Sequence, residues 1–252
     1  YKLKGGEFHG NIDPYHAEAY KLYMEGLHLI SLRLGKIPSQ EERIRGRELL
    51  RASIQLDPDL KEAYIQLGWD YLNNSDYQES LGIHNQLLSI SHGTNDSSGI
   101  HSALIMSATI NLKLGEYQTA EDEYLKSLQF STEHKTIVAL YKLGIIYREK
   151  NQFDNSIFFH KKALKTSIQE NEYYYQGVSD HYLGESYFYF GKFSQAIESF
   201  NSALDVWRTL NQKHQEIWTQ SWKLLAMMQL NQSIESKDLL SEIEFSLVEY
   251  QL

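Results

Sequence analysis

Few residues of this sequence have the types and the spacing that catalysis or metal binding requires. His92 and His101 flank Asp96 in a segment rich in serine, glycine and asparagine, and these three side chains could hold a metal ion. Histidines in such segments are usually only solvated, however, and the chain has no cysteine to add a thiolate ligand. The acidic residues 121–123 are best explained as the solvated face of a helix. We therefore predict no metal site and no cofactor.

Sequence motifs of common enzyme classes are missing. The chain has no H-E-x-x-H, no G-x-x-x-x-G-K-[ST], no G-x-S-x-G and no G-x-G-x-x-G. The segment "NEYYYQG" at residues 171–177 gathers three tyrosines, which could form a ligand platform or pack between helices; packing is the simpler interpretation. Because no acid, base and nucleophile can be named together, we predict a protein that is not an enzyme and has no catalytic residues.

Composition limits the classes of partner. The 252 residues include 33 acidic and 24 basic side chains, a formal net charge of −9, and no basic run. Binding to a nucleic-acid backbone needs clustered lysine and arginine, so we predict no nucleic-acid partner. No apolar run approaches the ~20 residues of a membrane span, so we predict no membrane contact within this chain.

The elements that would position any site are predicted to be helices. Only three prolines occur, and none follows Pro58. A long stretch without proline and without alternation of β-branched residues is typical of helices. We therefore expect an all-α protein.

Internal repeats support this fold class. The segments 140–164 and 180–204 match at an offset of 40: Leu143-Gly144 aligns with Leu183-Gly184, and Tyr147 with Tyr187. Weaker copies occupy 64–88 and 104–128, and the last of these has Ala108 in place of the glycine.

This pattern resembles the tetratricopeptide repeat (TPR). The best copy shows, in order, Leu183, Gly184, Tyr187, Gly191, Phe193, Ala196, Phe200 and Ala203. The resemblance implies pairs of helices that meet at a turn near Gly191 and stack into a right-handed superhelical solenoid. We place six repeats near 18–59, 61–92, 101–134, 137–170, 177–210 and 217–250. We expect a loop at 89–100, where the sequence is "SISHGTNDSSGI".

The first ~70 residues also resemble the junction that precedes TPR arrays in bacterial signalling proteins with a cyclase or winged-helix domain. This resemblance makes residues 1–12 the tail of an upstream domain or a linker, and 13–252 the array. The residues do not fix the location; we favour the cytoplasm, and the periplasm is the alternative if the upstream part carries a membrane span. Neither cyclase nor DNA-binding residues lie in this chain, so no activity carries over.

In such an array the first helices line a concave groove, and the residues one position after and three positions before each glycine should face it. Some of these residues could instead only pack between repeats. The lysines and asparagines with which some TPR proteins hold a C-terminal carboxylate are absent from these positions. Trp69 and Tyr141 are the strongest contact residues, because aromatic anchors concentrate binding energy. The predicted groove residues are Tyr23, Ile65, Trp69, Tyr141, Ile145, Arg148, His181, Glu185 and Phe188.

The last helix decides how the array ends. On a helical wheel its buried face should carry Leu239, Leu240, Ile243, Leu247 and Tyr250. Three apolar residues, Phe245, Val248 and Leu252, do not fit this face and are candidates for self-association.

From the repeats, the groove and the missing catalytic motifs, we predict a non-catalytic module that binds a protein or peptide in its groove and regulates an upstream signalling domain. The alternative is a self-associating scaffold, in the form of a homodimer.

Overall fold

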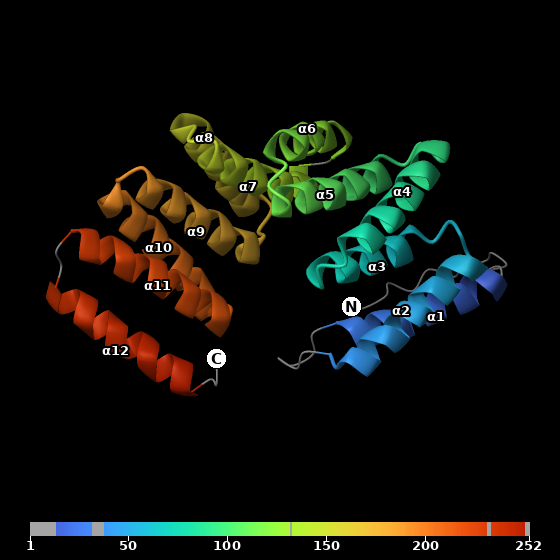
Figure 1. Cartoon of the computed structure of the whole chain (residues 1–252), viewed down its shortest axis with the longest axis horizontal. Helices are drawn as coiled ribbons and strands as arrows, with labels where there is room; N and C mark the ends of the chain where they lie inside the picture. The colour runs from blue at the N-terminus through green and yellow to red at the C-terminus, as the bar shows by residue number, and fades with distance from the viewer. Residues whose placement is uncertain (1–13, 32–37, 132, 231–232, 250–252) are drawn as a thin grey trace. The chain divides into compact units, whose positions relative to one another are not determined.

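The computed structural model describes residues 14–31, 38–131, 133–230 and 233–249, and in these ranges it contains helices and no strand (Figure 1). The predicted all-α fold of paired helices is confirmed. The α-helices are α1 (Pro14–Ile30), α2 (Gln40–Leu56), α3 (Lys61–Asn73), α4 (Tyr77–Gly93), α5 (Ser97–Lys113), α6 (Tyr117–Ser127), α7 (Glu133–Glu149), α8 (Phe153–Gln169), α9 (Tyr173–Tyr189), α10 (Phe193–Thr209), α11 (Lys213–Gln229) and α12 (Ser233–Glu249). A short 3-10 helix, η1 (Leu128–Phe130), follows α6.

The chain forms two compact units. Unit 1 runs to Ser107 and unit 2 begins at Ala108, so the helix α5 starts in one unit and ends in the other. In unit 1, α1 packs against α2 and α3 against α4; in unit 2, the hairpin pairs are α7 with α8, α9 with α10, and α11 with α12. The two helices of each of these hairpins are therefore antiparallel neighbours.

Most turns between the helices share one backbone design. A residue in the left-handed conformation ends the helix, for example Asn151 (φ 55°), Asn171 (φ 57°) and Asn211 (φ 53°), or Gly191 (φ 70°). The next N–H then donates to a carbonyl near the helix end, as Lys192 does to Tyr187 at 2.8 Å. This is the Schellman arrangement, which satisfies carbonyls that the helix leaves free.

These turns explain the offset of 40 in the sequence. Helices α7 to α12 all have 17 residues, and turns of three residues separate α7 from α8, α8 from α9, α9 from α10 and α10 from α11. The length beyond an ordinary TPR therefore lies in the helices. The expected loop at 89–100 was wrong, because α4 continues to Gly93 and α5 begins at Ser97. Its serine- and asparagine-rich composition reflects a short turn between two helices.

Glycine allows the paired helices to cross closely, as the repeat pattern implied. A Cβ atom built on Gly184 would lie 2.5 Å from the Phe200 ring, and one on Gly144 would lie 2.5 Å from the His160 ring. A Cβ atom built on Gly177 would likewise lie 2.7 Å from the Trp207 ring. A large side chain from the second helix therefore fills the space that each glycine leaves, and these pairs fix the position of the first helices.

Candidate functional site

An aromatic cavity in unit 2 is the most developed candidate site. Its volume is about 330 Å³, and helices α7, α9, α10 and α11 contribute to it. Five of its lining residues are aromatic rings of tyrosine or tryptophan. The lining residues are Tyr141, Tyr174, Val178, Tyr182, Trp207, His214, Gln215 and Trp218.

The rings hold one another in place. Tyr141 stacks on Tyr182 with their centroids 5.7 Å apart and their planes within 8°. Trp218 meets the same Tyr182 edge to face at 5.8 Å, and Tyr174 packs on Trp207 at 5.5 Å. Such contacts between rings stabilise by ~0.5–1.5 kcal/mol each beyond their burial. The walls of the cavity are therefore ordered before any ligand enters.

A buried polar network lies beside these rings. His181, fully buried, donates from Nε2 to Glu185 (2.8 Å), and its Nδ1 lies 2.9 Å from the Thr219 hydroxyl. Thr219 in turn accepts from the Trp207 indole N–H at 3.0 Å, and Glu185 accepts from Arg148. The network links α7, α9, α10 and α11 and satisfies its buried polar groups, so it fixes the four helices that form the cavity.

Burial keeps the tyrosine hydroxyls of the cavity in their neutral form. It raises the pKa of Tyr182 to about 12 and that of Tyr141 well above its ordinary value. Neither hydroxyl, nor that of Tyr174, has a hydrogen-bond partner among the described residues. Each of these groups can therefore donate to and accept from a ligand.

A lysine that forms no ion pair with a carboxylate of the described residues lies next to the cavity. The Nζ atom of Lys142 is 5.2 Å from the centroid of the Tyr141 ring. Burial lowers the pKa of Lys142 to about 8, and the positive charge of Lys113 adds to this effect. No ion pair joins Lys142 to any acidic group in the described part of the chain.

The predicted groove residues of unit 2 have different environments. Tyr141 lines the cavity, whereas Arg148, His181 and Glu185 form the buried network just described. Ile145 is buried, with 8% of its surface exposed. Phe188 packs on Phe193 and Trp222 of the neighbouring helices. That each of these residues contacts a partner remains a prediction.

In unit 1, Trp69 lines a second cavity, of about 450 Å³. Polar residues dominate its wall, and there Arg43 pairs with the buried Asp70 at 3.1 Å. Tyr23 belongs to the core of this unit, and Ile65 packs against that core. Of the groove residues predicted in unit 1, Trp69 is thus the one that lines this cavity.

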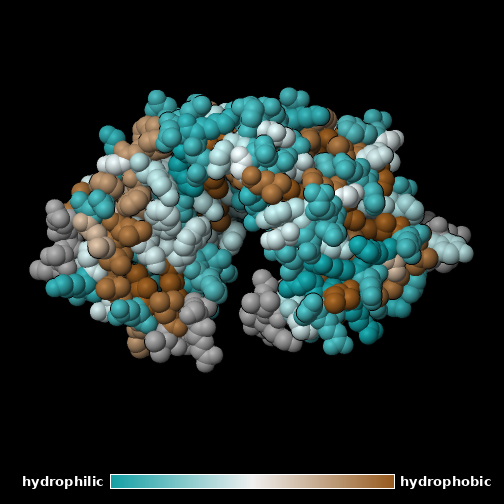
Figure 2. All heavy atoms as spheres, in the orientation of Figure 1, coloured by the Kyte–Doolittle hydropathy of each residue, from teal (hydrophilic) through white to brown (hydrophobic). Residues whose placement is uncertain are grey.

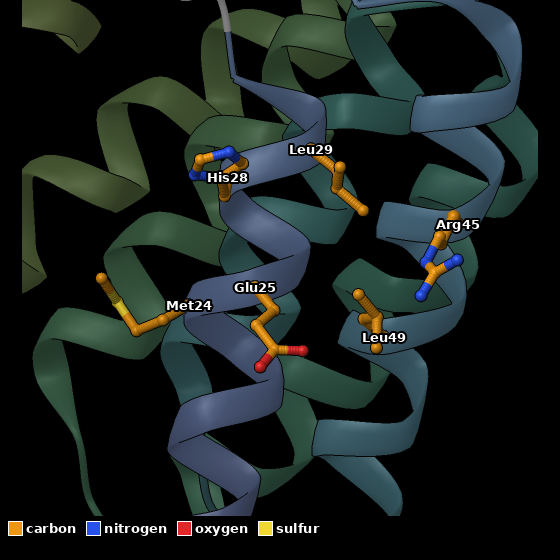
Figure 3. Close-up of a pocket in the computed structure, with 6 residues that line it drawn as sticks. All are labelled: Met24, Glu25, His28, Leu29, Arg45 and Leu49. Carbon is orange, nitrogen blue, oxygen red and sulfur yellow. The ribbon is translucent and has the colours of Figure 1, made fainter.

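A third cavity, of about 700 Å³, lies on the first hairpin of unit 1 (Figure 3). Figure 3 shows Leu29 of α1 and Leu49 of α2 directed toward the space between the two helices, with Met24 on the opposite side of α1. This cavity involves two helices only and has no aromatic wall. Its lining residues are Met24, Glu25, His28, Leu29, Arg45 and Leu49.

The last helix departs partly from its predicted pattern. Leu239 and Ile243 are buried, as expected, but Leu240 and Leu247 are 44% and 38% exposed, so their assignment to the buried face was wrong. Phe245 is 68% exposed, and apolar residues gather over α11 and α12 on the face drawn in Figure 2. The Val248 and Tyr250 side chains and Leu252 lie outside the described residues.

Sequence reasoning missed six residues of the aromatic cavity, and Tyr174 was noted only as one of three clustered tyrosines. The missed residues are Val178, Tyr182, Trp207, His214, Gln215 and Trp218. The predicted repeats began at 177 and 217, but α9 and α11 begin at Tyr173 and Lys213. The first turns of both helices, which carry part of the cavity wall, therefore lay outside the predicted repeats. The capacity of Asn171 and Asn211 to end the preceding helices was the signal that could have located them.

The described part of the chain contains neither a metal site nor a membrane-spanning helix. Within the described ranges, no three side chains of histidine, cysteine, aspartate or glutamate converge as metal ligands, and this includes the region of His92 and His101. Among the same residues, no helix has the length and apolar character needed to cross a membrane.

Comparison with known proteins identifies the repeat. A family model described as tetratricopeptide repeat matches residues 137–167, which span most of the α7–α8 hairpin. No curated protein sequence matches the chain significantly.

Solved structures extend the comparison to the whole fold. BtubC from P. vanneervenii has a TM-score of 0.71 at 12% identity, covering 95% of this chain and 93% of its own. TPR-like repeats of a putative kinesin light chain from Podospora anserina give 0.62 at 16% identity, covering 77% of this chain and 97% of their own.

A signal transduction ATPase with numerous domains (STAND) from Pyrococcus horikoshii has a tetratricopeptide repeat sensor. It gives a TM-score of 0.65 at 14% identity, covering 92% of this chain but 40% of its own. These structures share the fold with our protein. Residues 137–167 are thus a tetratricopeptide repeat, and the chain as a whole has the fold of tetratricopeptide repeat arrays.

Proposed function

We propose that this protein is a non-catalytic scaffold that binds a segment of a partner protein in the aromatic cavity of unit 2. The observation that supports this most is the cavity itself, which five aromatic rings line and a buried network holds in place. Aromatic residues in concave sites dominate the binding energy of protein interfaces. Because the rings are already ordered, little conformational entropy is lost when a ligand binds.

The free hydroxyls in the cavity suit a peptide. The hydroxyls of Tyr141, Tyr174 and Tyr182 can meet the carbonyl and N–H groups of a main chain, while the rings receive an apolar side chain. The acid–base groups nearby are less suited to catalysis, because His181 and Glu185 are buried and already paired. A binding role is therefore a better explanation than a reaction.

Regulation of an upstream signalling domain is part of the proposal. It is supported by the likeness to the STAND protein, whose tetratricopeptide repeats are described as its sensor. Binding of a partner in unit 2 would be the signal that is relayed.

Peptide display tests the proposal. A library of random peptides is selected on the intact chain, and the selected peptides are then measured on a variant with both Tyr182→Ala and Trp218→Ala. We expect binding to weaken at least tenfold, since each lost aromatic anchor removes ~1–2 kcal/mol. Circular dichroism must show an intact helical signal in the variant. Equal binding to a folded double variant would remove the cavity as the site.

The exposed apolar residues of α12 support a second proposal, self-association. Leu240, Phe245 and Leu247 are all more than a third exposed on the last helix. A two-fold contact would let this face cover itself in a homodimer. Light scattering of the wild type and of Phe245→Glu tests it: a dimer that Phe245→Glu converts to a monomer supports the contact. A monomer at every concentration, or a dimer that survives the change, excludes it.

A further inference from the structure

The charges around the aromatic cavity identify the kind of segment that fits it. None of the eight lining residues is acidic. A cationic ligand, which aromatic rings alone could accept, would find no carboxylate in the wall and the ammonium of Lys142 over the Tyr141 ring. The ligand chemistry is therefore decided by Lys142 and its surroundings.

Lys142 has no acidic partner among the described residues. Three acids of unit 2 pair with other cations: Glu185 pairs with Arg148 and His181, Glu149 with Arg148, and Glu121 with Lys150. The Lys142 ammonium lies over the ring of Tyr141, and Lys113 adds a second positive charge. An unpaired ammonium in a partly buried place is costly unless a counter-charge arrives.

We propose, as a refinement of the proposed function, that the cavity selects a segment in which an aromatic or other large apolar side chain stands next to an acidic side chain. The apolar group enters the cavity against the rings of Tyr182 and Trp218, and the side-chain carboxylate pairs with Lys142. The Tyr141 ring separates the two subsites, since it lines the cavity and lies below the Lys142 ammonium.

Burial makes this ion pair favourable. A carboxylate that meets Lys142 stabilises the charged form of an amine whose pKa burial lowers to about 8. Charge-assisted hydrogen bonds of this kind are about twice as strong as neutral ones. A surface lysine would contribute far less, because water and salt screen its charge.

Synthetic peptides test the inference without knowledge of the natural partner. The probes are hexapeptides with both termini blocked: one contains adjacent Phe and Glu, a second replaces Glu by Lys, and a third replaces Phe by Ala. A fourth has Phe, no acidic side chain and a free C-terminal carboxylate. Tryptophan fluorescence reports binding, because Trp207 and Trp218 line the cavity.

We expect the Phe–Glu peptide to bind about tenfold more tightly than the Phe–Lys peptide. Lys142→Glu should reverse this order, whereas Lys165→Glu, on the exposed surface of α8, should change neither affinity by more than about twofold. Circular dichroism establishes that both variants are folded, and Lys142→Gln should abolish the preference while keeping the aliphatic stem.

Several results would overturn the inference. Equal binding of the Phe–Glu and Phe–Lys peptides, or the same response to Lys142→Glu as to Lys165→Glu, would remove the acidic requirement while the proposed peptide site still stands. Binding of the free C-terminal peptide alone would move the carboxylate from a side chain to a chain end. Failure of every peptide to bind at millimolar concentration would count against both the inference and the proposed function.

Discussion

One buried histidine, His160, destabilises the hairpin in which it packs. His160 occupies the position against Gly144 that Phe200 occupies against Gly184 in the next hairpin. It is fully buried, and neither ring nitrogen has a hydrogen-bond partner among the residues that the structure describes. Since buried polar groups without partners are destabilising, phenylalanine suits this position better.

We predict that His160→Phe raises the free energy of unfolding by roughly 1–3 kcal/mol at neutral pH. Burial also lowers the pKa of His160 to about 3, below its ordinary 6.5. The folded state therefore resists protonation, and the stability of the wild type should fall as the pH drops from 6.5 toward 3. Urea unfolding at several pH values measures both effects, with the exposed His92→Phe as control. A less stable His160→Phe would contradict the argument.

Asp180 predicts the opposite pH dependence. Burial alone raises its pKa to about 7, and no ion pair or hydrogen bond to its side chain is found among the described residues. The folded state thus prefers the protonated acid, and this contribution is complete below the ordinary pKa of 3.8 and lost as the pH rises through 7. We expect Asp180→Asn to stabilise the protein by at least ~1 kcal/mol at pH 8 and much less at pH 4. A gain that does not vary with pH would exclude the titration of Asp180 as its cause.

Close contacts where paired helices cross fix the positions of the helices in this protein. A leucine at position 184 would force its side chain into the Phe200 ring and separate α9 from α10. We expect Gly184→Leu to cost roughly 1–3 kcal/mol or more, measured by thermal unfolding. Gly82 in α4 is the matched control, because a Cβ atom there meets nothing within 4 Å. Gly82→Leu should be neutral or stabilise by up to ~1 kcal/mol, and equal losses in both variants would show that crowding is not the cause.

Turns between helices depend on the left-handed residue. Asn211 has a φ of 53° and ends α10, so that α11 can begin at Lys213 and bring His214 to the cavity. Asn211→Ala should destabilise by ~1 kcal/mol, and Asn211→Gly should restore or exceed the wild-type stability. Unfolding curves that rank alanine above glycine here would argue against the turn geometry.

At the scale of the whole molecule, the sequence was sufficient to predict the fold. The recurrence of Leu-Gly and Tyr at an offset of 40 indicated paired helices, because only a packing pattern imposes such spacing on Gly144 and Gly184. It did not reveal where each helix starts, since asparagine at a turn carries a weaker signal than glycine. Three of the eight lining residues of the aromatic cavity, Tyr174, His214 and Gln215, fell outside the predicted repeats for this reason.

The candidate site depends on contacts that no spacing reveals. Tyr141 was predicted as a groove residue, and it does line the cavity. Trp218 on α11 meets Tyr182 through packing between hairpins, and Trp207 on α10 meets Tyr174 across the α9–α10 hairpin. Likewise, the sequence presents His181 and Glu185 as groove residues, while packing against α11 buries both.

The central claim, that the aromatic cavity of unit 2 is where a partner segment binds, can be tested with the four tryptophans of the chain. Trp207 and Trp218 line this cavity, Trp69 lines the cavity of unit 1, and Trp222 packs on Phe188. Indole N–H signals from 15N-tryptophan-labelled protein are recorded by NMR while a display-selected peptide is added. We predict that the Trp218 and Trp207 signals shift and that the Trp69 signal stays in place. A shift of Trp69 with Trp207 and Trp218 unchanged would contradict the claim.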